Sequence, residues 1–310
     1  MNDGLRPSAN HAAPAVNRRA FLTRATAALG TGAFFSTSEN ASAQLVRGPG
    51  RDAAVFNFAL NLEYLEAEFY SYATTGASIT ASGVAVNGSG TPGNVIVKAG
   101  STIVPFTTPE VQAFANELAS DERLHVVFLR TTLMNAGVPP VARPTIDLLN
   151  SFNTLGSMLG IGNFDPFASE VNFLLATFFF EDIGVTAYKG ASRLIANKTL
   201  VEAAAGVLAV EAYHAGIVRH FISQKAAVVV GATNVGTLAQ AFSDIRDSLD
   251  GADDRDQGVR TGGVNNLVPT DANGLVFSRT TRQVLNLAYG AVNASSGLFF
   301  PNGFNGQITT

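Results

Sequence analysis

Glu122-Arg123-Leu124-His125 recurs later in the chain as Glu211-Ala212-Tyr213-His214, so a glutamate is twice followed three positions on by a histidine. On an α-helix, residues i and i+3 lie on one face, and each pair can therefore direct both side chains at one point. The whole chain contains four histidines, and two of them occur in this pattern. The repeated spacing predicts two helices that each present a pair of metal ligands.

Both pairs lie inside apolar helical stripes. The two stripes are Val111, Ala115, Leu118, Glu122, His125 and Leu129, and Ala204, Val207, Glu211, His214, Val218 and Phe221. An ionised carboxylate in an apolar core costs much free energy unless it is protonated or acquires a partner. We expect a metal ion to be that partner. The alternative is a set of buried Glu–His hydrogen bonds in a metal-free bundle.

Two further glutamates occupy equivalent positions in other apolar stripes. Glu63 lies among Phe56, Leu60, Ala67 and Tyr70, and Glu181 lies among Leu174, Phe178, Val185 and Tyr188. In each stripe a tyrosine follows the glutamate by seven residues, about two helical turns along the same face. One Glu from each of two helices, with Glu-x-x-His from the other two, is the ligand pattern of di-iron and di-manganese carboxylate bundles.

The predicted metal ligands are Glu63, Glu122, His125, Glu181, Glu211 and His214. We expect Glu122 and Glu211 to bridge two divalent ions. Of the two outer glutamates, Glu63 should complete one site with His125, and Glu181 should complete the other with His214. Glu66 lies about 60° from Glu63 around its helix and is an alternative or additional ligand, whereas Glu68 should face solvent. Cysteine is absent, so only nitrogen and oxygen ligands remain, which suit iron or manganese without discriminating between them.

Other polar residues near the stripes have less direct predicted roles. Asp121 and Asp182 adjoin ligands but point about 100° away, which favours supporting or surface roles. The tyrosines near the stripes are expected to pack and donate hydrogen bonds rather than to be redox-active. These tyrosines are Tyr70, Tyr188 and Tyr213.

Four long periodic segments predict an all-α four-helix bundle. They span about 52–72, 107–137, 165–196 and 199–226, with Asp52 as a proposed N-cap of the first and a Thr199–Glu202 capping box opening the fourth. Residues 74–106 are rich in Gly, Ser, Thr and Val and predict a small β-rich, hairpin-like insertion. Residues 138–164 are long enough to cross the length of the bundle.

The rest of the chain divides into a leader and a C-terminal extension. We expect residues 44–230 to form the bundle and residues 231–310 to pack on it, with helices at about 237–249 and 279–289. The aspartates of the acidic loop at 250–257 are expected to be solvated, because they lack the ligand spacing of a calcium loop. Hydrophobic residues make up 46% of the chain and the net charge is only −4. This composition indicates a globular protein and argues against a nucleic-acid partner.

The leader, residues 1–43, has the features of a twin-arginine signal peptide. Arg18-Arg19 and Phe21-Leu22 precede a short apolar run, and Ala41-Ser42-Ala43 follows as a small-residue cleavage site. The run is too short for a permanent membrane span. We therefore expect the twin-arginine machinery to export the protein to the periplasm or the extracellular space. An amphipathic helix that happens to begin with two arginines is the alternative.

Three motifs resemble those of the ferritin-like desiccation-related and stress-protein family. They are Ala59-Leu60-Asn61-Leu62-Glu63-Tyr64-Leu65-Glu66-Ala67-Glu68-Phe69-Tyr70, Val268-Pro269-Thr270-Asp271-Ala272-Asn273-Gly274 and Phe299-Phe300-Pro301-Asn302-Gly303. The resemblance covers nearly all of the chain after the leader. It implies a ferritin-like bundle and a link to dehydration or oxidative stress, but no defined reaction.

An open dinuclear site suits peroxide or oxygen chemistry, because two metal ions can act together on both atoms of a small oxidant. Manganese would favour catalase-like disproportionation, and iron would favour oxidase or ferroxidase chemistry. The rival hypothesis is a non-catalytic stress protein whose stabilising or vacant metal site serves only the fold. A homo-oligomer is compatible with either hypothesis.

Replacing Arg18 and Arg19 by lysine is expected to abolish export while leaving folding intact, because the signal lies outside the predicted fold. Cell fractionation with detection of the protein measures this. Unchanged accumulation outside the cytoplasm would contradict the assignment of a twin-arginine signal.

Overall fold

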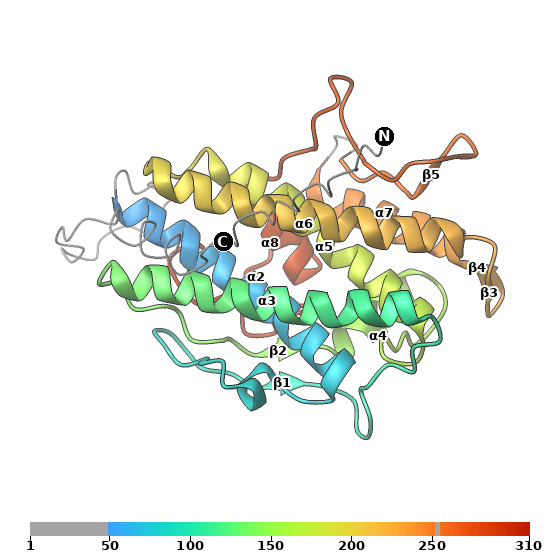
Figure 1. Cartoon of the computed structure of the whole chain (residues 1–310), viewed down its shortest axis with the longest axis horizontal. Coiled ribbons are helices and arrows are strands. Elements are labelled where there is room, and N and C mark those ends of the chain that lie inside the picture. The colour runs from blue at the N-terminus through green and yellow to red at the C-terminus, as the bar shows by residue number, and fades with distance from the viewer. Residues whose placement is uncertain (1–48, 252–254) are drawn as a thin grey trace, which may run out of the picture.

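The computed structural model describes residues 49–251 and 255–310, so the predicted signal peptide lies outside the described residues. Four long helices lie side by side: α2 (Pro49–Thr75), α3 (Pro109–Asn135), α5 (Glu170–Ser192) and α6 (Lys198–Gln224). Figure 1 shows α2 and α3 running in opposite directions, and α5 packs along α6 after a short link. The predicted all-α four-helix bundle is confirmed.

The helix starts differ in detail from the predictions. Asn197, not Thr199, caps α6, because its side chain accepts hydrogen bonds from the backbone N–H groups of Thr199 and Leu200. Helix α5 begins at Glu170 behind the N-cap Ser169, several residues later than predicted. Asp52 lies inside the first turn of α2, and its carboxylate accepts hydrogen bonds from the N–H groups of Ala196 and Asn197. It therefore ties the start of α2 to the α5–α6 link.

The predicted hairpin in the insertion after α2 is not formed. This segment contains a 3-10 turn, η1 (Ile79–Ser82), and the strand β1 (Val95–Ile96), which pairs in parallel with β2 (Ile146–Asp147) in the crossover between α3 and α5. The crossover also contains the short helix α4 (Asn150–Met158). Alternation in the sequence indicates a strand but not its partner, and here the partner lies about fifty residues away.

Glu68 is buried, contrary to the prediction that it faces solvent. Its carboxylate forms an ion pair with Arg143 of the crossover and accepts hydrogen bonds from the Ser78 hydroxyl and the Ile79 N–H of the insertion. A buried carboxylate requires such partners. Glu68 thus joins α2 to both of the long connections.

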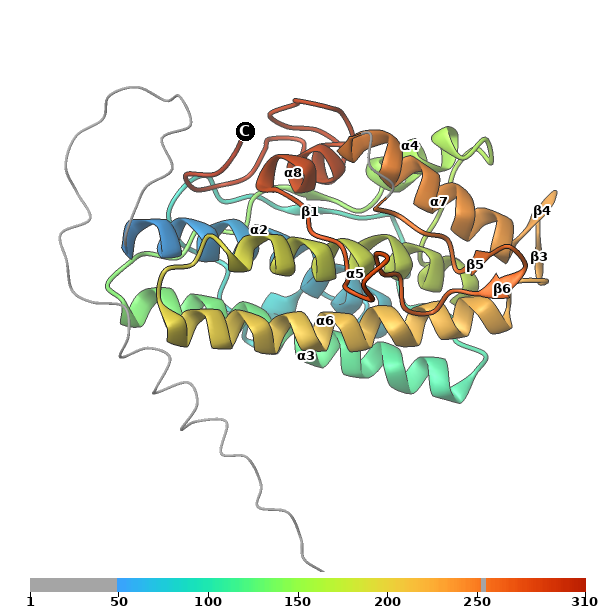
Figure 2. The ribbon, with the colours of Figure 1, turned by 90° about the horizontal axis from the view of Figure 1, so that it is seen from above.

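The C-terminal residues form a second layer over one side of the bundle. Their elements are β3 (Val229–Val230), β4 (Thr233–Asn234), α7 (Val235–Asp250), β5 (Arg260–Thr261), β6 (Val264–Asn265) and α8 (Thr281–Tyr289). Helices α7 and α8 match the predicted helices of the extension and pack on each other and on α5. In Figure 2 they lie over the α2–α5 side of the bundle, away from α3.

This second layer explains why α5 is apolar around its whole circumference. A helix with apolar residues on every face is buried on every face, and α5 lies between the bundle core and the C-terminal layer. By length and composition alone, α5 and α6 could each cross a membrane, but 78% of the most apolar window of α5 is buried inside the fold. The same test is passed by core helices of soluble proteins, so it is weak support for a membrane span.

A network of buried arginines and aspartates attaches the C-terminal layer to α5. Asp182 of α5 forms ion pairs with Arg219 at 2.7 Å and with Arg246 at 2.8 Å. Asp256 pairs with Arg246 at 2.7 Å and also with Arg279. Arg246 also lies over the Phe178 ring, 4.4 Å from its centroid, a favourable cation–π geometry.

Two of the loop aspartates predicted to be solvated are therefore buried. Asp250 lies 2.7 Å from Arg279, and Asp250 and Asp256 are 2% and 7% exposed. Asp253 and Asp254 lie outside the described residues. The prediction was wrong because Arg246 and Arg279 lie ten and twenty-three residues from Asp256 in sequence and reach its carboxylate only when the chain folds.

Replacing Asp256 by alanine is expected to lower the free energy of unfolding by about 3–5 kcal/mol, because it leaves two buried guanidinium groups short of a carboxylate. Urea denaturation measures the change. Asp244→Ala is the matched control, since Asp244 lies exposed on α7 and its loss should cost less than about 0.5 kcal/mol. Equal stability of the two variants would contradict the structural role of the network.

Candidate metal centre

Each bundle helix contributes one glutamate to the centre of the bundle. Glu63 comes from α2, Glu122 from α3, Glu181 from α5 and Glu211 from α6, and all four are at most 1% exposed. They converge because each lies in the apolar stripe that its helix turns toward the core. The four carboxylates that were selected from the sequence are thus brought together.

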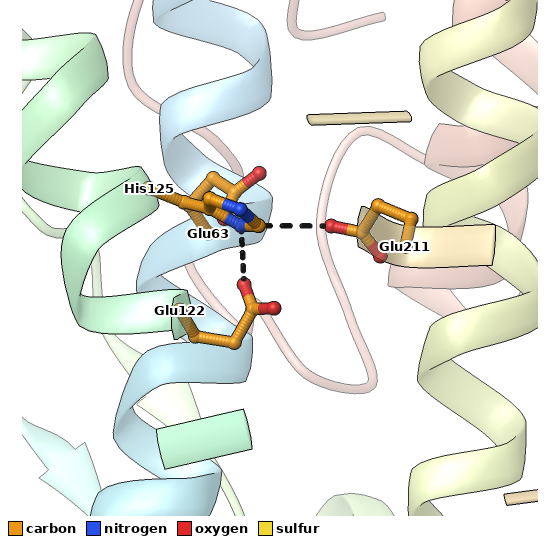
Figure 3. A group of neighbouring side chains, drawn as sticks. All are labelled: Glu63, Glu122, His125 and Glu211. Carbon is orange, nitrogen blue, oxygen red and sulfur yellow. Dashed lines mark hydrogen bonds and ion pairs between the residues drawn. The ribbon is translucent and has the colours of Figure 1, made fainter. Parts of the chain in front are cut away.

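One group of side chains gathers around His125, as Figure 3 shows. The His125 Nδ1 atom lies 3.1 Å from Glu122 Oε2, 3.2 Å from Glu63 Oε2 and 3.8 Å from Glu211 Oε1. One potential ligand atom from each of these four residues lies within 4.8 Å of all the others. This is a separation at which one metal ion can be held.

A second group gathers around His214. Its Nδ1 atom lies 3.3 Å from Glu122 Oε1 and 3.3 Å from Glu181 Oε2. One potential ligand atom from each of these three residues lies within 4.8 Å of the others. Glu122 belongs to both groups and faces a different histidine with each oxygen. Glu122 therefore lies between the two groups, where a bridging ligand is expected. Glu211 belongs to the first group only.

Several buried polar atoms of the cluster have no hydrogen-bond partner. They are Glu63 Oε2, Glu122 Oε1, Glu181 Oε2, both carboxylate oxygens of Glu211, and His214 Nδ1. Buried polar atoms are rarely left without a partner in folded proteins. These atoms carry lone pairs that point into a shared interior, and a cation is the partner that suits such a set. The donor set therefore fits divalent metal ions.

The pKa values of the cluster depend on burial and on the neighbouring charged groups. Burial raises the pKa of Glu63 to about 7, partly offset by His125. Burial and the neighbouring carboxylates also raise the pKa of Glu211 well above its usual range. Burial opposes ionisation of Glu122 as well, but the two histidines outweigh it and lower the pKa of Glu122. Because a metal ion binds deprotonated carboxylates, its binding would displace protons from this cluster.

Two tyrosines hold the outer carboxylates in a crossed arrangement. The Tyr70 hydroxyl on α2 donates to Glu181 of α5, and the Tyr188 hydroxyl on α5 donates to Glu63 of α2. Each bond crosses from one helix pair to the other, so it fixes the orientation of a carboxylate that would otherwise be free to rotate. This is the hydrogen-bonding role predicted for these tyrosines, whereas Tyr213 is 72% exposed and has no place in the core.

Glu66 and Asp121 lie beside the cluster. Glu66 is 6% exposed and belongs to neither ligand group. Burial raises its pKa well above the usual range, and the nearby Glu122, Glu181 and Glu63 carboxylates raise it further. Asp121 Oδ2 lies 3.5 Å from His214 Nε2, where it can orient the imidazole. Glu66 as an alternative or additional ligand stays a prediction.

Gly184 is a feature of the centre that the sequence interpretation missed. A Cβ atom at this position on α5 would lie 2.1 Å from Glu211 Oε2, closer than any real contact. The missing side chain therefore makes room for the Glu211 carboxylate against the α5 backbone. A glycine in the middle of an otherwise apolar helix, three residues after Glu181, was the available signal, since such a glycine costs helix stability.

The fold and this site define a ferritin-like protein, and the chain belongs to that family: the sequence profile of the ferritin-like domain matches residues 51–224. Within it, the chain is 30% identical to the desiccation-related protein PCC13-62 of Craterostigma plantagineum, over 84% of each chain. It is 26% identical to the ferritin-like catalase Nec2 of Nesocodon mauritianus, over 83% of this chain and 84% of the relative. No solved structure matches it significantly. The resemblance to desiccation-related proteins is thereby confirmed.

Replacing Gly184 by alanine is expected to destabilise the metal-free protein by about 1–3 kcal/mol, the typical cost of overpacking a core. Gly206→Ala on α6 is the control, because nothing lies within 4 Å of a Cβ there. The control should gain up to about 1 kcal/mol from helix propensity.

In a Glu211→Ala background, the same Gly184 substitution should become stabilising, because the clashing carboxylate is gone. Chemical denaturation of the four variants forms a double-mutant cycle. If Gly184→Ala stabilises the unaltered protein as much as Gly206→Ala does, the close approach of Glu211 is refuted.

Proposed function

We propose that this chain is an exported ferritin-like protein that holds two divalent metal ions, manganese or iron, and breaks down hydrogen peroxide under desiccation or oxidative stress. The observation that carries the proposal is the set of buried carboxylate and imidazole atoms without hydrogen-bond partners at the centre of the bundle. Two findings on relatives support the physiological setting, since one is named a desiccation-related protein and another a ferritin-like catalase.

The proposed ligand sets follow the two observed groups. Glu63, His125 and Glu211 would hold one ion, Glu181 and His214 would hold the other, and Glu122 would bridge them. With Glu122 counted for both, the first ion would have four protein ligands and the second three. Manganese and iron commonly take about six ligands, so each ion would keep positions for exchangeable molecules. The set differs from the sequence prediction only in placing Glu211 with one ion instead of between both.

A pair of redox-active ions supplies the electron transfer by which two molecules of hydrogen peroxide become two of water and one of dioxygen. The chain supplies confinement and orientation. The histidine side chains are 10% and 5% exposed and the carboxylates of the cluster at most 1%, so only a small molecule can reach them. Tyr70 and Tyr188 fix the outer carboxylates, and Asp121 orients His214 from the partly exposed side.

Glu122→Ala and His214→Ala are each expected to lose bound metal, because Glu122 belongs to both groups and His214 anchors the second. Glu117→Ala is the matched control, since Glu117 lies exposed on the same helix as Glu122. Elemental analysis of the purified proteins measures metal per chain. Full occupancy in both ligand variants would refute the proposed centre.

The metal-loaded protein is expected to consume hydrogen peroxide and to release half a molecule of dioxygen for each molecule consumed. The apoprotein is loaded separately with manganese and iron, and peroxide loss and dioxygen are followed with Glu181→Ala beside it. Dioxygen uptake by the iron form without peroxide disproportionation would identify oxidase chemistry instead. Inactivity of every preparation that retains metal would favour the non-catalytic stress-protein hypothesis.

A further inference from the structure

A small cavity of about 20 Å³ lies within the bundle and is lined by residues from all four of its helices. Its lining includes Ala59 of α2, Leu129 of α3, Tyr188 of α5, and Ala204 and Val207 of α6. A volume above roughly 10–15 Å³ on this measure accommodates one molecule of about the size of water. The cavity therefore has room for a single very small guest.

The cavity lies next to the candidate metal centre along the bundle axis. On three helices, a lining residue lies one turn, about 5.4 Å, from a proposed ligand. These pairs are Ala59 and Glu63, Leu129 and His125, and Val207 and Glu211. The pairs run in opposite chain directions on neighbouring antiparallel helices, so all three place the cavity on the same side of the ligands.

Tyr188 separates the cavity from the carboxylates. Its side chain lines the cavity, while its hydroxyl donates to Glu63. The nine other lining residues all have hydrocarbon side chains. The one polar group at the boundary is thus already engaged with the metal centre, and the cavity wall has no hydrogen-bonding group left for a guest.

This lining selects its guest by polarity. Water and hydrogen peroxide would lose their hydrogen bonds on entering, and apolar cavities of this kind stay dry while admitting apolar gases. Two lining residues, Ala59 and Phe128, are partly exposed, so the cavity lies near the surface at this point. The cavity thus lies between the surface of the bundle and the neighbourhood of the ligands.

We propose that this cavity is a binding site for dioxygen beside the metal pair. Its preference for an apolar gas follows from the lining alone, whereas the identity of the gas rests on the proposed function, in which dioxygen is the product of peroxide breakdown or the oxidant of an iron form. Dioxygen is small and apolar, and peroxide is not, so the cavity distinguishes the two molecules that the centre would handle.

Xenon is the probe for the cavity, because it is an inert apolar atom detectable in crystals by its electron density. Crystals of the protein as purified are expected to show xenon against Ala59, Ala204 and Val207 under gas pressure. Absence from this cavity of both xenon and krypton, the second of which is close to dioxygen in size, overturns the proposal. This measurement needs neither bound metal nor activity. The cavity proposal can therefore be refuted while the proposed function stands, and the proposed function can be refuted while the cavity proposal stands.

Ala204→Leu is expected to fill the cavity and remove the xenon, with Ala204→Val as a smaller change should the leucine prevent folding. Ala205→Leu is the matched control, since Ala205 is the exposed neighbour on the same helix, and it should leave xenon binding unchanged. Retention of xenon in both Ala204 variants would overturn the assignment of the guest to this cavity.

The same variants, loaded with metal, identify the source of dioxygen. If the dioxygen in the cavity is the product of peroxide breakdown, filling the cavity is expected to slow dioxygen release several-fold. The control Ala205→Leu should leave that rate unchanged. If the dioxygen is the oxidant, filling the cavity is expected to slow oxidation of the iron-loaded protein by dioxygen and to spare peroxide consumption. A filled cavity with unchanged rates in both reactions would overturn dioxygen as the guest.

Discussion

The burial of carboxylates in the bundle core is the constraint on which the rest of the structure depends. Each of the four core helices carries a glutamate that is removed from water, and a carboxylate there needs hydrogen-bond donors, protons or a cation. The protein supplies two hydrogen-bond donors, the hydroxyls of Tyr70 and Tyr188. Lone pairs on every one of the four glutamates remain without a partner, which is why a cation explains the arrangement better than a metal-free hydrogen-bond network does.

Helix α5 connects this constraint to the C-terminal layer. Its consecutive residues Glu181 and Asp182 face different surroundings, because neighbours on a helix are about 100° apart. Glu181 faces the candidate metal centre. Asp182 forms ion pairs with Arg219 and Arg246 beneath the C-terminal layer. The ion-pair network therefore restrains the rotation of the helix that presents a proposed ligand, and Gly184 on the same helix leaves the space that Glu211 occupies.

The centre and its surroundings suit chemistry with very small molecules. The ligands approach solvent mainly through the two histidines, near Asp121, while an apolar cavity lies one turn away along the bundle axis. A polar oxidant and an apolar gas would thus meet the centre through different surroundings.

Sequence alone determined the helices and their glutamates and histidines, because helical periodicity relates residues three, four and seven positions apart and apolar stripes indicate the buried face. It could not determine contacts between distant segments. Glu68 is buried because Arg143 reaches it from the crossover, Asp256 is buried because Arg246 and Arg279 surround it, and β1 pairs with a strand of another connection. Those partners, like the gap that Gly184 leaves for Glu211, arise only when the chain packs, since burial and charge compensation depend on atoms brought together by the tertiary structure.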